Sequence, residues 1–155
     1  MDNSITSAND LFFMEQALKL ASECAAKGEV PVGSVLVADD VIIAQSGNAP
    51  ISLMDPTAHA EINTIRKGAS CLGNYRLVGT TLYSTLEPCV MCAGAIMHAR
   101  IERLVFGAYD EKSGACGSVV DLFGNNQLNH HTSVIGGLMA NECAAVLKSF
   151  FKKRR

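Results

Sequence analysis

The chain has 155 residues, of which 48% are hydrophobic and 18% charged, and its formal net charge is -2 at pH 7. This is the composition of one globular domain, and folding at this length buries about 70% of the unfolded surface, so a core can form without disulfides. The net charge argues against a generally basic nucleic-acid binder, although five of the 13 basic residues lie between Lys148 and Arg155. No apolar run approaches the roughly 20 residues of a membrane span, and no signal peptide is recognised, which predicts a soluble cytoplasmic protein without a membrane partner.

Hydrophobic spacing, turn residues and helix-starting signals predict an alternating series of helices and strands. In chain order, the pattern predicts helix 10–27, strands 32–38 and 41–45, helix 58–67, strand 80–85, helix 88–100, strands 103–107 and 132–135, and helix 141–153. The first two strands flank the turn signal Asp39-Asp40 and predict an antiparallel hairpin, whereas the strand-helix-strand units predict parallel pairs. We therefore expect a single α/β domain over 1–155, with a mixed five-stranded sheet and helices on both faces, preceded by a disordered segment 1–9 and ending in a basic tail.

Two cysteines three positions apart, Cys89 and Cys92, follow the strand 80–85 at the start of a predicted helix. Positions i and i+3 share one face of a helix, so both sulfurs can reach one ion, and the helix N-terminus favours their thiolate form. A redox dithiol has the same spacing but leaves His59-Ala60-Glu61 without a role. Together with His59, the two thiolates form a ligand set that suits zinc better than magnesium or calcium.

Three protein ligands leave one position of a tetrahedral zinc open, where the pKa of a bound water falls toward about 7. Glu61, two residues after His59, is then a candidate general base and acid. Side chains at i and i+2 do not share a helix face, so His59 and Glu61 must converge through the geometry of the first turn. A structural zinc would instead need a fourth ligand, and the sequence offers these candidates: His98, Cys116, His130 and His131.

The cysteines outside the C-x-x-C pair need another interpretation. In a cytosolic chain we expect no disulfides among them. We interpret each as a small buried apolar residue: Cys24, Cys71, Cys116 and Cys143.

The segment His59-Ala60-Glu61, followed after 26 residues by Pro88-Cys89-Val90-Met91-Cys92, resembles the signature of zinc nucleobase deaminases. Further segments resemble bacterial tRNA-specific adenosine deaminases of the cytidine/deoxycytidylate deaminase superfamily: Glu29–Val37, Asp55–Glu61, Asn74–Leu77, Thr81–Ala95 and Phe106–Ala108. The resemblance covers nearly the whole chain. It implies a three-layer α/β/α sandwich of the cytidine-deaminase type, one Zn²⁺ per subunit and a homodimer.

The same resemblance implies hydrolytic deamination of the wobble adenosine of a tRNA anticodon stem-loop to inosine, with release of ammonia. It implies that His59, Cys89 and Cys92 hold the zinc and that Glu61 is the catalytic acid and base. It also implies substrate contacts at six further positions: Val30, Asn48, Leu86, Asp110, Asn129 and Phe151. For Asn48 and Asp110, a turn residue and a loop cap are the alternative interpretations.

Two other functions remain open from the sequence. A deaminase of a free base or nucleoside, such as guanine, cytosine or cytidine, shares the zinc signature but has no need of a cationic surface for phosphates. The basic residues from Lys148 to Arg155 favour an RNA substrate over these small molecules. A noncatalytic zinc-stabilised binding module would keep the metal ligands and give Glu61 no role.

Overall fold

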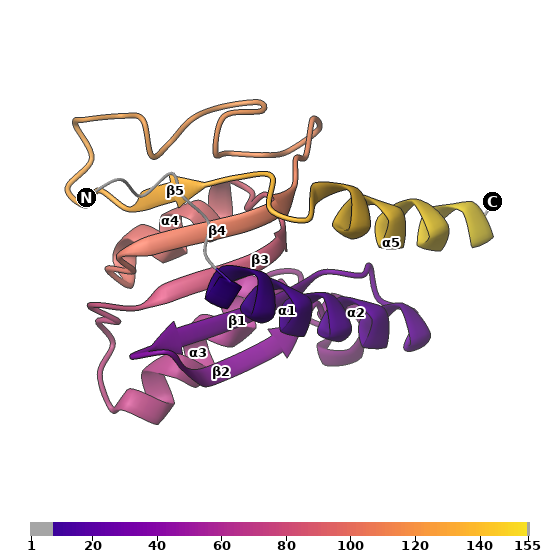
Figure 1. Ribbon diagram of the computed structural model, residues 1–155, viewed down its shortest axis with the longest axis horizontal. Helices are drawn as coiled ribbons and strands as arrows, with labels where there is room; N and C mark the ends of the chain where they lie inside the picture. The colour runs from indigo at the N-terminus through magenta and orange to yellow at the C-terminus, as the bar shows by residue number, and fades with distance from the viewer. Residues whose placement is uncertain (1–7, 155) are drawn as a thin grey trace.

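A five-stranded mixed sheet forms the centre of the computed structural model, which describes residues 8–154 (Figure 1). The elements in chain order are α1 (Ala8–Ala26), β1 (Gly33–Ala38), β2 (Val41–Gly47), α2 (Pro50–Leu53), α3 (Ala60–Leu72), β3 (Thr81–Leu86), α4 (Val90–His98), β4 (Arg103–Ala108), β5 (Ser133–Ile135) and α5 (Ala140–Lys153). The strand order is β2-β1-β3-β4-β5. Strand β1 is antiparallel to both β2 and β3, whereas β3, β4 and β5 are parallel, which confirms the predicted mixed sheet.

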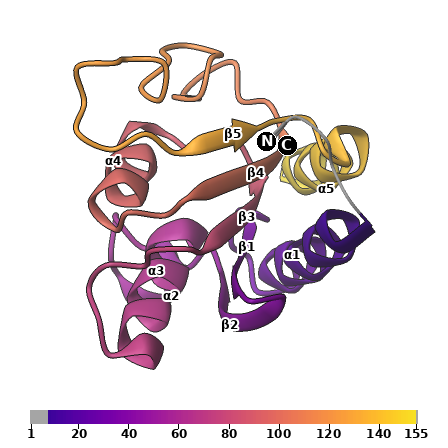
Figure 2. The same cartoon turned by 60° about the vertical axis from the view of Figure 1, so that its left-hand side comes forward.

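Helices cover both faces of the sheet. Figure 2 shows α1 and α5 side by side on one face and α3 and α4 on the other. The central strands β1, β3 and β4 are buried almost throughout, as expected for strands covered on both faces. This arrangement confirms the predicted three-layer α/β/α sandwich. Within residues 8–154, no helix has the length and apolar character needed to cross a bilayer.

The helices and strands predicted from the sequence are all present, and their ends differ by a few residues. The short helix α2 was not predicted, because its Gly, Asn and Pro surroundings indicate a loop. The prediction of disorder over 1–9 lies outside the described residues, except that Ala8 and Asn9 are the first residues of α1. The hairpin turn is formed by Asp39 and Asp40, which both have positive φ.

Helix α3 extends to Leu72, beyond the predicted end at Lys67, because Gly68 does not stop it. Gly68 is buried, and a Cβ at this position would lie 2.4 Å from a methyl carbon of Leu36. The residue therefore lets α3 approach β1 closely. The helix ends instead at Gly73, whose φ of 63° is in the left-handed region that favours glycine.

Helix α1 packs directly on β1 through Gly33. A Cβ at Gly33 would lie 1.9 Å from the carbonyl oxygen of Ala17 and 2.9 Å from the amide nitrogen of Ala21. These are main-chain atoms of a helix, which cannot move independently. The absence of a side chain at Gly33 thus sets the distance between the helix layer and the sheet.

We predict that Gly33→Ala lowers the free energy of unfolding by about 1–3 kcal/mol, the usual cost of overpacking a core. Urea denaturation monitored by circular dichroism measures the change. The matched control is Gly94→Ala in α4, where an added Cβ meets no atom within 4 Å. Because alanine is favoured over glycine in a helix interior, Gly94→Ala should leave the free energy of unfolding unchanged or raise it by up to about 1 kcal/mol. Equal midpoints for Gly33→Ala and the wild type would show that α1 is not held at this distance.

Candidate metal centre and active site

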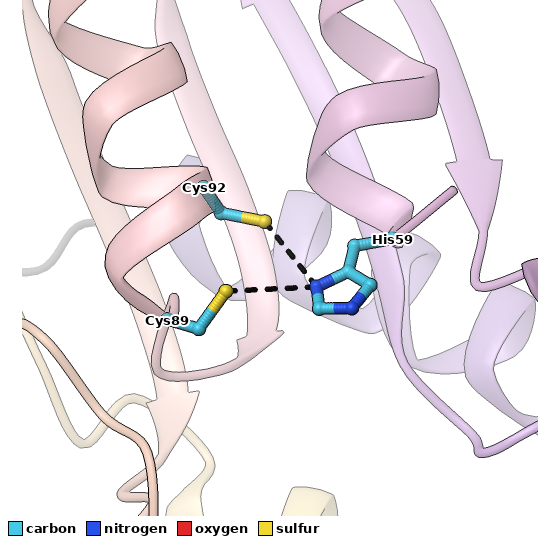
Figure 3. A group of neighbouring side chains, drawn as sticks. All are labelled: His59, Cys89 and Cys92. Carbon is cyan, nitrogen blue, oxygen red and sulfur yellow. Dashed lines mark hydrogen bonds between the residues drawn. The ribbon is translucent and has the colours of Figure 1, made fainter. Parts of the chain in front are cut away.

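The N-termini of α3 and α4 meet at the carboxyl end of β3. His59 is the N-cap residue of α3 and Cys89 is the N-cap residue of α4, and both have extended backbone conformations. Cys92 lies in the first turn of α4. Figure 3 shows the three side chains pointing toward one another from the ends of the two helices. The sequence pattern predicts His59 and Cys89 inside their helices. In the structure both residues are instead N-caps, directly before the first helical residue.

The three donor atoms fit a single zinc ion. His59 Nδ1 lies 3.6 Å from Cys89 Sγ and 3.5 Å from Cys92 Sγ. All three donor atoms lie within 4.8 Å of one another. Tetrahedral zinc with Zn–S of about 2.3 Å and Zn–N of about 2.0–2.1 Å requires a nitrogen-to-sulfur separation of about 3.6 Å. The observed spacing therefore matches the geometry of bound zinc. A redox dithiol would need only the two cysteines, so the presence of His59 in the cluster favours the metal site.

The environment of the two thiols favours metal binding. A hydrogen bond from Cys92, together with the nearby His59 imidazole, lowers the pKa of Cys89 to about 4 against the opposing effect of burial. The same bond and burial raise the pKa of Cys92. A cation bound between the two sulfurs stabilises both as thiolates.

None of the candidates for a fourth protein ligand joins this cluster within residues 8–154. His98 and His131 are exposed at the surface. The His130 ring nitrogen Nε2 donates a hydrogen bond to the carbonyl oxygen of Ile101 at 2.8 Å. Cys116 is outside the group of donor atoms, and burial raises the pKa of its thiol. The ligand set of three leaves one coordination position for water, which is the arrangement of a catalytic zinc.

Glu61 lies beside the three candidate ligands as a buried carboxylate. It is the second residue of α3 and only 4% exposed. Burial raises the pKa of Glu61, and this outweighs hydrogen bonds to the carboxylate from its own amide and from the Cys92 thiol. Side chains two positions apart point to different faces only within a helix. His59 precedes α3, so this restriction does not apply to His59 and Glu61. The N-cap geometry therefore brings ligand and carboxylate to the same site.

Three of the six predicted substrate contacts lie close to the metal centre in the fold. The main chain at Asn48 and Ala49 is tied to this region, because the Ala49 amide donates to the carbonyl oxygen of Ala58, next to His59. Val30 lies on the same edge, since the Asn48 amide donates to the carbonyl oxygen of Val32. Leu86 ends β3, three residues before Cys89. Their contacts with a base remain a prediction.

The other three predicted contacts are farther along the chain. The Asp110 carboxylate accepts hydrogen bonds from the amides of Lys112 and Ser113 and from the Ser113 hydroxyl, which is the loop-capping role that the sequence left open. Asn129 is exposed in the long connection between β4 and β5. Phe151 is 48% exposed, whereas its neighbour in α5 is buried, as expected for two adjacent helical aromatics.

Sequence reasoning missed the burial of Glu29 and Glu87. Glu29 accepts hydrogen bonds from the Ser52 amide and hydroxyl, at 2.7 and 2.6 Å, and from the Ile51 amide at 3.2 Å. Glu87 receives hydrogen bonds from the loop after β4. Both lie in segments that resemble the deaminases, but nothing in the residue type distinguishes a buried glutamate from a surface charge. An acidic residue beside an otherwise apolar segment is the one available signal.

The remaining cysteines agree with the sequence interpretation in part. All six cysteines are free, and Cys24 and Cys143 are buried as expected. Cys116 is half-buried. The expectation is wrong for Cys71, which lies exposed in the last turn of α3.

Two thiolates, an imidazole, an open coordination position and a buried carboxylate on an α/β/α fold define a hydrolytic zinc centre. Residues 7–108 match the family model for the cytidine and deoxycytidylate deaminase zinc-binding region, and the chain belongs to this family. A tRNA-specific adenosine deaminase of Haemophilus influenzae is 52% identical over 97% of this chain and 88% of the relative. A tRNA-specific adenosine deaminase of Bacillus subtilis is 42% identical over 94% of this chain and 91% of the relative.

Solved structures show the same similarity. A chain from studies of A-to-I editing by tRNA:A34 deaminases at the wobble position of transfer RNA has 49% identity and a TM-score of 0.85. It covers 88% of this chain and 99% of its own length. A guanine deaminase from Bacillus subtilis has 39% identity and a TM-score of 0.63, over 72% of this chain and 71% of its own. The predicted fold type is thereby confirmed, together with a zinc-binding deaminase domain.

We predict that Cys89→Ala and His59→Ala lower the zinc content of the purified protein well below one ion per chain, because each removes one of three ligands. Mass spectrometry of the metal, normalised to protein concentration, measures this. Cys71→Ala is the control, since Cys71 is exposed and outside the cluster. Glu61→Gln should retain zinc because Glu61 is not a ligand. Unchanged zinc in either ligand variant would remove that residue from the site.

Proposed function

We propose that this chain hydrolyses the wobble adenosine of a tRNA anticodon to inosine and ammonia, with one Zn²⁺ held by His59, Cys89 and Cys92. The observation that carries the proposal is the buried Glu61 beside a three-ligand metal site. The relatives named tRNA-specific adenosine deaminase, which match nearly the whole chain, support the choice of substrate.

The chemistry needs a nucleophile, a proton carrier and a leaving group. Zinc, when bound, supplies a water activated as a nucleophile at neutral pH. Glu61 accepts the proton of this water and delivers it to the ring nitrogen beside the reacting carbon. Oxygen becomes bonded to the carbon that carries the amino group. Glu61 then takes the remaining proton of the new hydroxyl group and transfers it to the amine, and the carbon–nitrogen bond breaks as the carbon–oxygen bond becomes a carbonyl. Adenosine and one water molecule thus become inosine and one ammonia.

A cationic surface near α5 supports an RNA substrate over a free base. Phe151 lies in a surface hollow together with basic side chains from α5 and from the loop after β4: Lys112, Lys148, Lys152 and Arg154. Cations neutralise phosphates, and an exposed aromatic ring can stack on an unpaired base. A free purine would use neither. The predicted contact at Phe151 therefore belongs to the proposed RNA-binding surface.

We predict turnover of an anticodon stem-loop with adenosine at the wobble position, measured as inosine by nuclease digestion and mass spectrometry. The matched control is the same stem-loop with guanosine at that position, and free guanine, adenosine and cytidine are offered in parallel. Glu61→Gln should lose about 10²–10⁴-fold in rate, the usual contribution of a general acid and base. Turnover of only the free bases or nucleosides would establish the small-molecule alternative. Wild-type activity in Glu61→Gln would refute its proton-transfer role, and no turnover at all would favour a binding module.

We also propose that the chain forms a homodimer through a surface beside the active site. The short helix α2 presents apolar side chains to solvent, and Met54 at its end is 92% exposed, with Ile51 and Leu53 nearby also exposed. Adjacent exposed apolar residues of this kind mark interaction surfaces. Glu29 holds α2 in place through its bonds to Ile51 and Ser52.

Sedimentation equilibrium should give twice the chain mass of 16.5 kDa. Met54→Asp should shift the protein toward the monomer, because a charge in an apolar interface loses its hydration. Val41→Asp is the control, since Val41 is exposed on β2 away from α2. A monomeric wild type at micromolar concentration, or equal dissociation of both variants, would contradict the proposed surface.

A cytoplasmic location is part of the same proposal. All six cysteines are free, and the two metal-binding thiols must stay reduced to hold zinc. A reducing compartment provides this condition.

A further inference from the structure

Glu87 joins β3 to the metal ligands and is almost completely buried. It lies between Leu86, the last residue of β3, and Pro88-Cys89, and it is 2% exposed. Its amide donates a hydrogen bond to the carbonyl oxygen of Ala108 at 2.8 Å, which continues the pairing of β3 with β4. We refer to residues 87–89 as the ligand turn. Glu87 does not belong to the metal cluster itself.

The Glu87 carboxylate accepts four hydrogen bonds from residues 110–118, the Asp110 loop. One oxygen, Oε1, accepts from the Asp110 amide at 3.1 Å and from the Ser118 hydroxyl. The other, Oε2, accepts from the Cys116 amide at 2.9 Å and from the Ser118 amide at 3.2 Å. One buried side chain thus binds both ends of the loop. These bonds keep the pKa of Glu87 below its ordinary value although burial alone would raise it.

The main chain of the Asp110 loop is also attached to the ligand turn. The Ala115 amide donates to the carbonyl oxygen of Pro88 at 2.8 Å. Gly114 closes over the carboxylate so tightly that an added Cβ would lie 2.4 Å from Glu87 Cδ and Oε2. The ligand turn and the Asp110 loop therefore form one hydrogen-bonded unit, with Glu87 at its centre.

The Asp110 loop carries groups that the proposed function assigns to RNA. Lys112 lies in the surface hollow with Phe151 and Arg154 of the α5 segment. Asp110 itself is one of the predicted substrate contacts. The hydrogen bonds between the Asp110 loop and the ligand turn therefore set how far Asp110 and Lys112 lie from the metal ligands.

We propose that Glu87 is a positioning residue: it fixes the Asp110 loop on the ligand turn and so sets where the RNA-binding groups stand relative to the reacting base. The kinetic part of this inference rests on the proposed function, whereas the structural part does not. Glu87 acts through the loop and touches neither metal nor substrate.

Replacing one carboxylate oxygen of Glu87 by an amide NH₂ group tests this role, because all four partners are hydrogen-bond donors. All four partners donate hydrogen, so the site requires an acceptor on both oxygens. Glutamine has the same shape but presents two donor hydrogens on one side, which would face N–H or O–H donors. At least one pair of donors then loses its acceptor in a buried place, and the loop must move to reach water.

We predict that Glu87→Gln keeps one zinc per chain but raises KM for the anticodon stem-loop by about tenfold or more, with a smaller change in kcat. Hydrogen exchange should become at least about tenfold faster at the amides of Cys116 and Ser118. Glu111→Gln is the matched control: it makes the same chemical change in the same loop, at an exposed side chain outside the Glu87 contacts. It should leave zinc, KM and exchange unchanged.

Ser118→Ala provides a second variant if Glu87→Gln does not fold. It removes one donor and leaves three amide bonds, so we expect the same direction with a smaller effect, about two- to fivefold in KM. Unchanged amide exchange in both variants would overturn the inference. A fall in kcat in proportion to lost zinc, at constant KM, would also overturn it, because Glu87 would then support only the ligands. If the wild type does not act on the stem-loop, the proposed function fails, and amide exchange still decides the positioning role.

Discussion

The active site depends on the meeting of two helix N-termini at the carboxyl end of β3. His59 and Cys89 are both N-cap residues with extended backbones, so each side chain leaves its helix at the end that faces the other helix. The partial positive charge at both helix ends favours thiolates and a carboxylate at the same place. A zinc site assembled in this way needs only one further residue, Cys92, from the first turn of α4. The parallel pairing of β3 and β4 and the packing of α3 against α4 maintain this meeting point.

Three buried glutamates, Glu29, Glu61 and Glu87, have different environments. Glu61 lies against the ligands, where burial raises its pKa. Glu29 and Glu87 are as deeply buried, but hydrogen bonds from hydroxyls and main-chain amides lower their pKa values against the effect of burial. No basic side chain within residues 8–154 forms a salt bridge with any of the three. The fold thus stabilises two of these charges with hydrogen bonds from neutral groups, while the pKa of the third stays raised by burial.

The metal centre and the substrate preference have separate structural origins. Two thiolates, an imidazole and a glutamate would activate water equally well for a free base or for a nucleotide in RNA. A guanine deaminase with 39% identity has a similar fold, so the fold alone does not choose between these substrates. What differs must lie in the segments around the metal centre: the loop at Asn48, the Asp110 loop and α5 with its basic residues. Each of these segments is attached to the sheet or the ligand turn by hydrogen bonds or packing contacts.

The sequence by itself predicted the order of elements except α2, the mixed sheet, and the candidate zinc ligands and Glu61, because these follow from local spacing and residue chemistry. It placed His59 and Cys89 inside their helices instead of at the N-caps. It also ended α3 at Lys67, since local rules do not show which glycine packs against Leu36. Only the tertiary structure decided that the zinc has three protein ligands, because distant histidines and Cys116 could have joined it. It alone showed the hydrogen bonds of Glu29 and Glu87, whose partners lie more than 20 residues away along the chain. Burial and hydrogen bonding across such separations arise from the packed fold, and no local pattern encodes them.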